Sequence, residues 1–346
     1  MILEYSRIAD IALGAHNVEI KKDGVVFHRL SPRQELLYKE RTSSFYEKAR
    51  SSSGIVLRFR TDSESIAFKV RVARGSSRKY FSFDLFVNGT FKKSFNNFEG
   101  ADLSGDYTKI QLPLGEFSFG ADLEKGEKEV ALYFPWSVRV TLAELSLSDG
   151  AFVVPIKPER KMLMLGDSIT QGYDALYPSR KYSTRLAEYF SAEERNLAIG
   201  AELFFPPLVS ESDGEEPDII TVAYGTNDWF FGTLAEFKGN CKAFFEALSK
   251  SYPEAEIIAL TPIWRKDMND TDKAGDFREI GEYIKAVIKT IPNAKAVDCF
   301  DLVPRDTALF ADLMLHPNDQ GFDHYIENLL KSIKTAESEF SGAILV

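Results

Sequence analysis

The 346-residue chain is long enough for two domains, each with its own hydrophobic core. Its 44% hydrophobic and 27% charged residues are typical of a soluble globular protein. A formal net charge of −10 argues against nucleic acid or an anionic membrane as a partner, because both require a basic surface. No apolar run approaches the roughly 20 residues that cross a bilayer, and no basic segment precedes a long apolar block at the N-terminus.

The two cysteines, Cys241 and Cys299, are too few for a disulfide framework and form no CxxC motif. We expect both to be reduced core residues, in keeping with a cytoplasmic location. The four histidines are scattered and do not combine with these cysteines at ligand spacing, so no metal site and no cofactor are expected.

Residues 1–150 show the short alternating runs and frequent turns of an antiparallel β-sandwich, which we expect to be jelly-roll-like. Asp23-Gly24 and Asn88-Gly89 each predict a hairpin turn. A polar stretch at 34–48 predicts a short helix. Strands are expected at 18–20, 25–30, 54–60, 66–72, 80–87, 129–134 and 137–147.

Residues 151–160 contain two prolines and are interpreted as an ordered connector between domains. From residue 161 to 346, apolar runs alternate with helical patterns, which predicts a parallel sheet covered by helices in a three-layer α/β/α domain. The capping box Thr233…Glu236 opens one helix, and Asn318 is expected to cap the last. Strands are expected at 162–165, 197–199, 219–223, 257–260 and 296–297, and helices at 182–189, 234–248, 277–288 and 322–333.

Polar residues follow these predicted strands, and the carboxyl ends of parallel strands meet at one rim of the sheet. Ser168 follows the first strand, Gly200 the second and Asn227 the third, while Asp312 and His316 lie near the end. A hydroxyl, backbone N–H groups, a carboxamide, an imidazole and a carboxylate are together the groups needed for acyl transfer.

Three of these blocks resemble the SGNH (GDSL-type) hydrolase family. GDSIT at 166–170, GTND at 225–228 and HPN at 316–318 occur in the family's order. The resemblance covers roughly residues 160–335. The preceding β-rich region, together with YGTNDW and TPIWR, is similar to the two-domain members grouped as family 2 carbohydrate esterases.

The resemblance implies that Ser168 is the nucleophile and His316 the base. The oxyanion would be held by the backbone N–H groups of Ser168 and Gly200 and by the side chain of Asn227. The family often has a second glycine or a serine beside the second-block glycine, whereas here the pair is Gly200-Ala201, so the donor could be Ala201.

The acid is the second departure from the family pattern. In the family it usually stands three residues before the histidine, but Leu313 occupies that position here and Asp312 is four residues before His316. Asp312 could complete a triad, or a backbone carbonyl could orient the histidine in a dyad.

Other polar residues near these blocks admit structural interpretations. Asp167 and Asp228 are expected to tie loop backbone together by side-chain hydrogen bonds. Trp264 and Arg265 could line a substrate pocket, or could be an edge aromatic and a surface charge. The remaining histidines, His16, His28 and His324, are expected to be structural, and the chain has no GxSxG elbow.

These observations predict a two-domain serine esterase that hydrolyses small acyl esters, with acetyl groups on carbohydrates as the favoured substrate; the carbohydrate part rests on the two-domain resemblance alone. An acyltransferase using the same serine is the first alternative, and a carbohydrate-binding protein on an inactive scaffold is the second. The expected partner is a small acylated substrate, without nucleic acid or membrane, and a homo-oligomer is left open. The first domain could bind sugar, mediate a dimer or brace the rim of the sheet.

Overall fold

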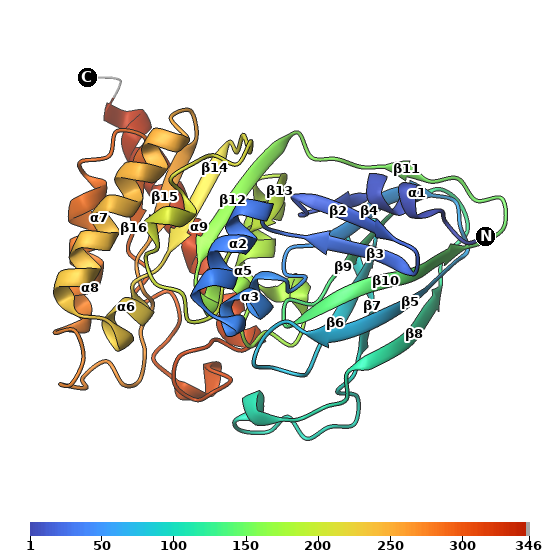
Figure 1. The fold of residues 1–346 in the computed structure, drawn as a ribbon, viewed down its shortest axis with the longest axis horizontal. Coiled ribbons are helices and arrows are strands. Elements are labelled where there is room, and N and C mark those ends of the chain that lie inside the picture. Colours follow the sequence, from blue (N-terminus) through green and yellow to red (C-terminus); the bar gives the residue numbers. More distant parts are fainter. Residues whose placement is uncertain (344–346) are drawn as a thin grey trace. The chain divides into compact units, whose positions relative to one another are not determined.

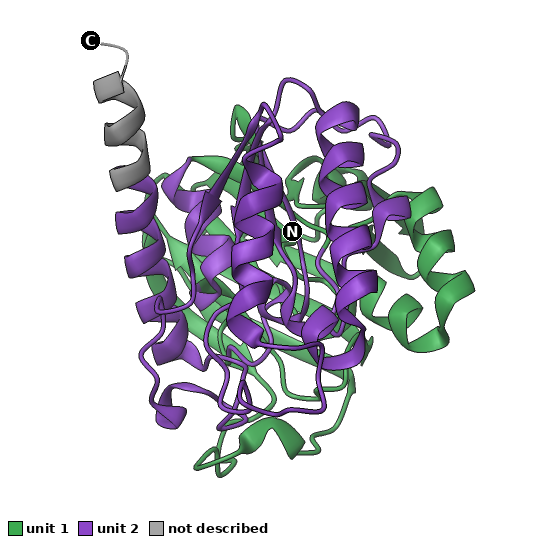
Figure 2. Cartoon of the chain, turned by 90° about the vertical axis from the view of Figure 1, so that its left-hand side faces the viewer, with its two compact units in different colours: residues 1–161, 176–179, 191–197 green, residues 162–175, 180–190, 198–346 purple. Residues whose placement is uncertain are grey.

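The computed structural model describes residues 1–343, with side chains described through residue 334. The chain divides into two compact units, coloured separately in Figure 2. The first unit comprises residues 1–161, 176–179 and 191–197, and the second comprises residues 162–175, 180–190 and 198–346. Two short segments beyond residue 161 therefore group with the first unit.

The first unit contains two antiparallel sheets, and most of their strands are labelled in Figure 1. One sheet has the order β1-β4-β9-β6-β7, with β11 paired to β4, and the other has the order β2-β3-β10-β5-β8. The strands are β1 (Ala12–Leu13), β2 (Asn17–Lys21), β3 (Gly24–His28), β4 (Val56–Thr61), β5 (Ser65–Arg74), β6 (Ser82–Val87), β7 (Thr90–Asn96), β8 (Gly115–Asp122), β9 (Lys128–Tyr133), β10 (Val138–Leu147) and β11 (Val154–Pro155). Strand β11 lies within the predicted connector 151–160.

The core of this unit forms where the two sheets face each other. Strand β5 alternates buried and exposed residues, so that Phe68, Val70 and Val72 point into the core. The ring of Phe68 contacts that of Phe83 from the other sheet in an edge-on arrangement, with centroids 5.3 Å apart. The predicted β-sandwich is confirmed.

The hairpin at Asn88-Gly89 is confirmed: Val87 pairs with Thr90, and both turn residues have positive φ, 49° and 73°. Strands β7 and β8 were missed by the sequence analysis. Strand β8 carries a clear signal, because half-buried and exposed residues alternate along all 8 of its positions.

The prediction of a single helix at 34–48 is wrong, because two helices form there. Helix α2 (Pro32–Arg41) is followed by Thr42, whose backbone is extended, and α3 (Ser43–Ala49) begins immediately after this residue. The Thr42 hydroxyl accepts the Phe45 N–H at 3.1 Å, which caps the new helix. A short helix α1 (Tyr5–Asp10) precedes them.

Arg29 is fully buried in the first unit, and its guanidinium binds backbone carbonyls. Nε donates to Ser51 O and Nη2 to Lys48 O, both at 2.9 Å, and Nη1 donates to Asn196 O. This one side chain therefore ties the segment 191–197 to residues of the sandwich.

We expect Arg29→Met to lower the free energy of unfolding by about 3 kcal/mol, because buried carbonyl oxygens lose their donors. Denaturant unfolding measures the change. Arg60→Met is the matched control: its exposed ion pair with Glu127 is 3.0 Å long, and we expect its loss to cost at most about 1 kcal/mol. Equal changes in the free energy of unfolding of the two variants would contradict a special stabilising role for the buried Arg29.

The second unit contributes four parallel strands in the order β12-β14-β15-β16. They are β12 (Arg160–Gly166), β14 (Ile219–Ala223), β15 (Glu256–Leu260) and β16 (Ala294–Val297). The helices are α4 (Ser168–Gln171), α5 (Tyr182–Tyr189), α6 (Thr226–Phe231), α7 (Leu234–Ser251), α8 (Phe277–Ile288) and α9 (Asp319–Ala343). Helix α5 packs on α9, and α7 and α6 pack on α8. The predicted parallel sheet with its helices is confirmed.

Two helix starts follow the predicted chemistry. At α7, the Thr233 hydroxyl accepts the Glu236 N–H and the Glu236 carboxylate accepts the Thr233 N–H, which completes the capping box. At α9, Asn318 Oδ1 accepts the Gly321 N–H at 3.0 Å.

The prediction of a strand at 197–199 is wrong. The strand is β13 (Ala192–Asn196), and residues 197–199 form a buried loop after it. Polar side chains hide β13 in the sequence: Glu194 and Asn196 are buried, and Asn196 Nδ2 donates to Glu194 Oε1 at 2.9 Å. An apolar run reports burial, but burial does not require a strand.

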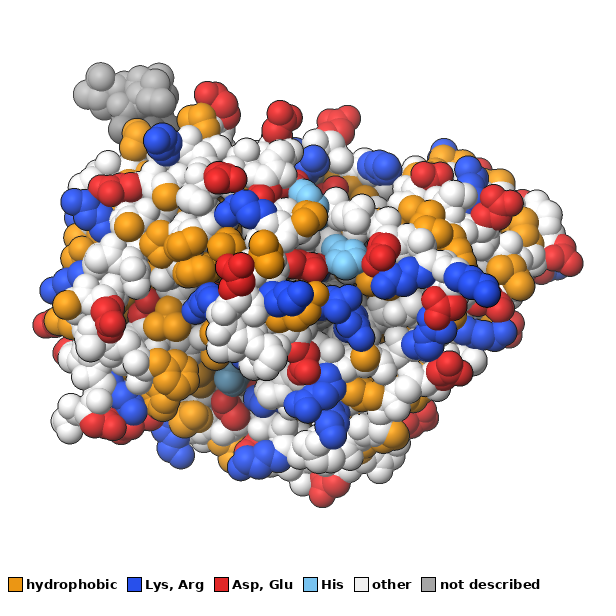
Figure 3. All heavy atoms as spheres, viewed as in Figure 1, with side chains coloured by type: hydrophobic (Ala, Val, Ile, Leu, Met, Phe, Trp, Pro, Cys, Tyr) orange, Lys and Arg blue, Asp and Glu red, His pale blue; other side chains and the backbone are white. Residues whose placement is uncertain are grey.

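Cys241 and Cys299 are both buried and unpaired, as expected. Among residues 1–343, no helix combines the length and the apolar character needed to cross a membrane. Acidic and basic side chains are interspersed over the face shown in Figure 3.

Candidate active site

Ser168 lies at the first position of helix α4, two residues beyond the end of β12. Asp167 caps this helix by accepting the Ile169 N–H at 2.9 Å. Gly166 is required at the end of the strand, because a Cβ there would lie 2.3 Å from Thr170 Oγ1. The strand and its cap thus fix the serine at the carboxyl end of a buried strand.

Ser168, His316 and Asp312 form a continuous chain of hydrogen bonds. His316 Nε2 lies 2.8 Å from Ser168 Oγ, and His316 Nδ1 lies 2.7 Å from Asp312 Oδ2. All three residues belong to the second unit, so this arrangement is formed within one compact unit.

The unusual spacing of Asp312 is accommodated by the backbone of Leu313, whose φ is +57°. This left-handed residue turns the chain so that Asp312 Oδ1 accepts N–H groups from Met314, Leu315 and His316 at 3.0, 2.8 and 3.1 Å. The other oxygen, Oδ2, remains directed at the imidazole. The four-residue spacing therefore still brings the carboxylate to the histidine.

The Asp312 carboxylate is held in its charged form. Burial by itself raises its pKa, but the hydrogen bond and charge of His316 and the backbone N–H donors outweigh burial and hold the pKa well below its usual range. A carboxylate that stays ionised can fix the imidazole tautomer throughout a reaction.

Asn227 follows Gly225, whose φ of +116° turns the chain into helix α6. Its side-chain Nδ2 donates to Glu202 O at 3.0 Å, which orients the amide. An amide nitrogen carries two hydrogens, so one donor remains beyond this bond.

The backbone N–H of Gly200 donates to Gln171 Oε1 at 2.8 Å. For the neighbouring Ala201 N–H, in contrast, the described residues offer no acceptor. Ala201 has a φ of +68°, an unusual conformation for a residue with a Cβ. Gly200 itself is confined by Tyr173, since an added Cβ would lie 2.7 Å from the tyrosine oxygen.

Asp167 and Asp228 tie loop backbone together, as expected: Asp228 Oδ1 accepts the Phe204 N–H at 3.1 Å. Burial raises the pKa of Asp167 to about 6 and that of Asp228 to about 7. These shifts are opposite in direction to that of Asp312, whose bonds to His316 and to backbone N–H groups outweigh burial.

Arg265 is not a surface charge, because only 2% of it is exposed. Its Nε lies 2.5 Å from Asp267 Oδ1, and Nη1 donates to Thr226 O and Oγ1 at 3.1 and 3.0 Å. It thereby braces the turn that carries Asn227. Trp264 is half-buried, and its ring packs against Phe310 with centroids 5.4 Å apart.

Two residues beside His316 were missed by the sequence analysis. Asp174 Oδ2 lies 3.6 Å from His316 Nδ1, and the Tyr173 ring lies 5.6 Å from the imidazole, centroid to centroid. Both follow the GDSIT block closely, but no residue pattern marks them as facing a histidine 142 positions away. Single ligand atoms of Asp174, Asp312 and His316 lie within 4.8 Å of one another, so these residues could approach a cation together. The hydrogen bond between His316 and Asp312 already joins two of these three residues.

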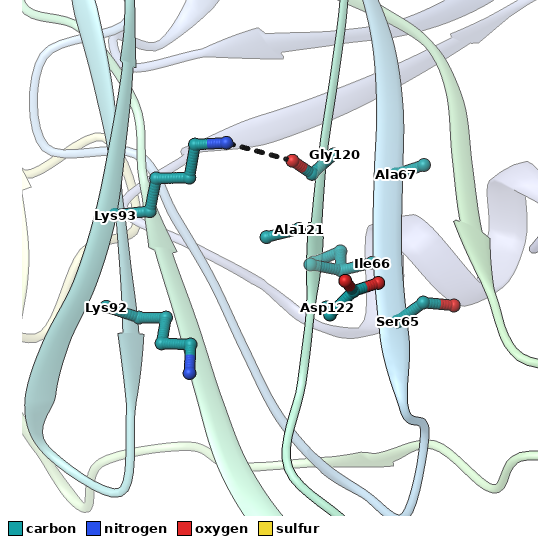
Figure 4. Close-up of a pocket in the computed structure, with 8 residues that line it drawn as sticks. All are labelled: Ser65, Ile66, Ala67, Lys92, Lys93, Gly120, Ala121 and Asp122. Atoms are coloured by element: carbon teal, nitrogen blue, oxygen red, sulfur yellow. Dashed lines mark hydrogen bonds between the residues drawn. The ribbon is translucent and has the colours of Figure 1, made fainter.

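The first unit carries a separate polar hollow of about 640 Å³, shown in Figure 4. Lys93 Nζ reaches across it to Gly120 O at 3.4 Å. It is lined by residues of β5, β7 and β8, namely Ser65, Ile66, Ala67, Lys92, Lys93, Gly120, Ala121 and Asp122. None of these lining residues is aromatic.

The chain is similar to a known protein family and to solved structures. Residues 164–324 match the model of the GDSL-like lipase/acylhydrolase family, so the resemblance predicted from the sequence is confirmed. A search of curated proteins finds no match to the chain.

Solved structures resemble the chain over nearly its whole length. The salicylyl-acyltransferase SsfX3 from a tetracycline biosynthetic pathway has a TM-score of 0.79 at 19% identity, covering 94% of each chain. A putative GDSL-like lipase from Bacteroides ovatus has a TM-score of 0.74 at 18% identity, covering 97% of each. The acetyl xylan esterase Est2A from Butyrivibrio proteoclasticus has a TM-score of 0.62 at 16% identity, covering 98% of each. At these identities the likeness shows a shared two-domain fold.

Proposed function

We propose that the protein is a serine esterase that cleaves small acyl esters through a covalent acyl-enzyme. The single observation that carries the proposal is the unbroken chain from Asp312 through His316 to Ser168, with links of 2.7 and 2.8 Å. Serine is a weak nucleophile at its free pKa, and an adjacent oriented base is what activates it. Here the base is oriented by a carboxylate that stays ionised.

The proposed reaction begins with the His316 proton on Nδ1, donated to Asp312. Nε2 accepts the Ser168 proton as Oγ attacks the ester carbonyl, and a tetrahedral oxyanion forms. The imidazolium then protonates the departing alcohol as the C–O bond breaks. Water repeats the same steps on the acyl-serine, which releases the carboxylic acid and restores the enzyme.

We assign the oxyanion donors to the backbone N–H groups of Ser168 and Ala201 and to the side chain of Asn227. Ala201 replaces Gly200 in this role because the Gly200 N–H is bonded to Gln171. The positive φ of Ala201 is consistent with a functional demand on its backbone, since strained residues cluster at such sites.

We expect Asn227→Ala to lower kcat by about 10²- to 10³-fold with little change in KM, because full negative charge develops on the oxygen only in the transition state. Initial rates over a range of p-nitrophenyl acetate concentrations separate the two constants. An increase in KM at constant kcat would contradict the role. Asn293→Ala is the matched control, because Asn293 Nδ2 likewise binds backbone carbonyls, at Tyr252 and Ala255, outside the site.

Acetyl groups on carbohydrates are the substrates we favour. Support comes from the likeness to the acetyl xylan esterase and to a family two carbohydrate esterase from Clostridium thermocellum, which has a TM-score of 0.66 at 14% identity. These are likenesses of fold, so the substrate requires a direct test. Acetylated sugars are compared with esters of longer acyl chains, and the proposal expects the highest kcat/KM on the acetylated sugars.

An acyltransferase is the second candidate, favoured by the TM-score of 0.79 to the salicylyl-acyltransferase. Both candidates form the same acyl-serine and differ in which nucleophile attacks it. The reaction is run in water with an added alcohol acceptor, and free acid and acylated acceptor are quantified. Free acid as the main product supports the esterase, whereas acylated acceptor as the main product supports the transferase.

A further inference from the structure

Asp174 is a buried carboxylate facing the side of His316 that already binds Asp312. Its side chain has no exposed surface, and its Oδ2 lies 3.6 Å from His316 Nδ1. That distance exceeds a hydrogen bond between these two atoms, so the contact between the carboxylate and the ring is electrostatic in kind. A charge removed from water is poorly screened by salt and acts strongly at such short range.

The backbone holds Asp174 rigidly with respect to the nucleophile. The Ser168 carbonyl accepts the N–H groups of Gly172 and Tyr173 at 3.0 and 2.9 Å, and the Ala175 N–H donates to Gly172 O at 3.0 Å. Gly172 has a φ of +113°, which ends helix α4 and redirects the chain. Ser168 and Asp174 therefore lie on one hydrogen-bonded turn.

We propose that Asp174 is a second acidic positioning residue for His316, one that stabilises the imidazolium and substitutes in part for Asp312. This inference rests on the proposed function. Asp312 fixes the tautomer through its hydrogen bond, while Asp174 adds a second negative charge facing the same nitrogen. Other groups near the ring include Ser168 at Nε2, the ring of Tyr173 and, at longer range, Asp167.

The first test measures the pKa of His316 directly by NMR titration of the imidazole nitrogens. The chain has four histidines, so the signal is assigned by comparison with His316→Asn. Asp174→Asn is expected to lower this pKa by about 0.5–1 unit, because removal of a nearby negative charge destabilises the imidazolium. The acidic limb of the kcat/KM profile, which reports the free enzyme's base, should move to lower pH by the same amount.

The matched control is Asp298→Asn, which also removes one charge from the second unit. Asp298 pairs with Lys285 at 2.8 Å, so its loss should leave the His316 pKa unchanged. Asp174→Glu retains the charge and should preserve much of the wild-type pKa. If Asp174→Asn does not fold, Asp174→Glu compared with Asp174→Ser makes the same measurement. An unchanged His316 pKa in the variant without the charge overturns the inference.

The second test asks whether Asp174 substitutes for Asp312. Asp174→Asn should lower kcat/KM by about 5- to 10-fold in the wild type and by about 50- to 100-fold in the Asp312→Asn background, since residues acting on one ring are not additive. If Asp174→Asn lowered kcat/KM by the same factor in both backgrounds, the inference that Asp174 partly replaces Asp312 would be overturned. The NMR titration needs no turnover: a wild type without esterase activity would end the proposed function but not the electrostatic coupling.

Discussion

Ser168→Ala is expected to reduce acyl-ester hydrolysis by about 10⁴- to 10⁶-fold, close to the background rate, because no covalent intermediate can form without the hydroxyl. Only one oxygen atom is removed, and the backbone of residue 168 keeps its place at the start of helix α4. We therefore expect substrate binding and the unfolding transition to change little. Rates with p-nitrophenyl acetate, measured beside thermal unfolding, check both expectations.

Ser249→Ala is the matched control for this substitution. Ser249 lies on helix α7 of the same unit, and its hydroxyl donates to Asn293 Oδ1 at 2.6 Å, away from the site. Its loss should leave the rate unchanged. Equal rates for wild type and Ser168→Ala would exclude serine catalysis and with it the proposed function. Mass spectrometry of protein trapped with a slowly deacylating ester should also find the acyl group on Ser168 in the wild type alone.

Structure could be predicted from the sequence where local chemistry determines it. Asn88-Gly89 demands a tight hairpin, and the Thr233…Glu236 capping box demands a helix start, and both form. The prediction failed at β13, where buried polar residues bond to one another within the strand and so hide it from hydropathy. The break at Thr42 was missed because helix-forming sequence lies on both sides of this capping residue.

The same distinction applies to the site. Short sequence motifs are enough to predict Ser168, Asn227 and His316 as site residues. The structure places Ser168 within hydrogen-bond distance of His316. Gly200 could not be separated from Ala201 in advance, because the contact that distinguishes them comes from Gln171 at the end of helix α4. Asp174 carries no sequence signal at all, since only the folded turn brings it beside the imidazole.

Asp312→Asn tests the role of the acid, and we expect a loss of kcat of about 10²- to 10³-fold, below the roughly 10⁴ seen when an isolated triad loses its acid. In the native protein Oδ1 accepts three backbone N–H groups and Oδ2 faces the ring, so both oxygens are acceptors. An asparagine at position 312 has only one oxygen. Its NH₂ must therefore face either the three backbone N–H groups or His316 Nδ1. If the NH₂ faces His316 Nδ1, the ring proton moves to Nε2, and the imidazole can no longer accept the Ser168 proton.

The remaining activity should come from Asp174, which still faces Nδ1 at 3.6 Å. The measurement is kcat across the pH range, with Asp323→Asn as the control because Asp323 pairs with Arg185 at 2.6 Å rather than with the histidine. A loss of only a few-fold would contradict the triad and favour a dyad in which Asp312 merely ties the loop. A loss of 10⁴ or more would instead deny Asp174 any compensating role. Asp312 also accepts three backbone N–H groups, so Asp312→Asn could disturb the loop as well as remove the acid. The thermal unfolding temperature of the variant shows whether the loop has been destabilised.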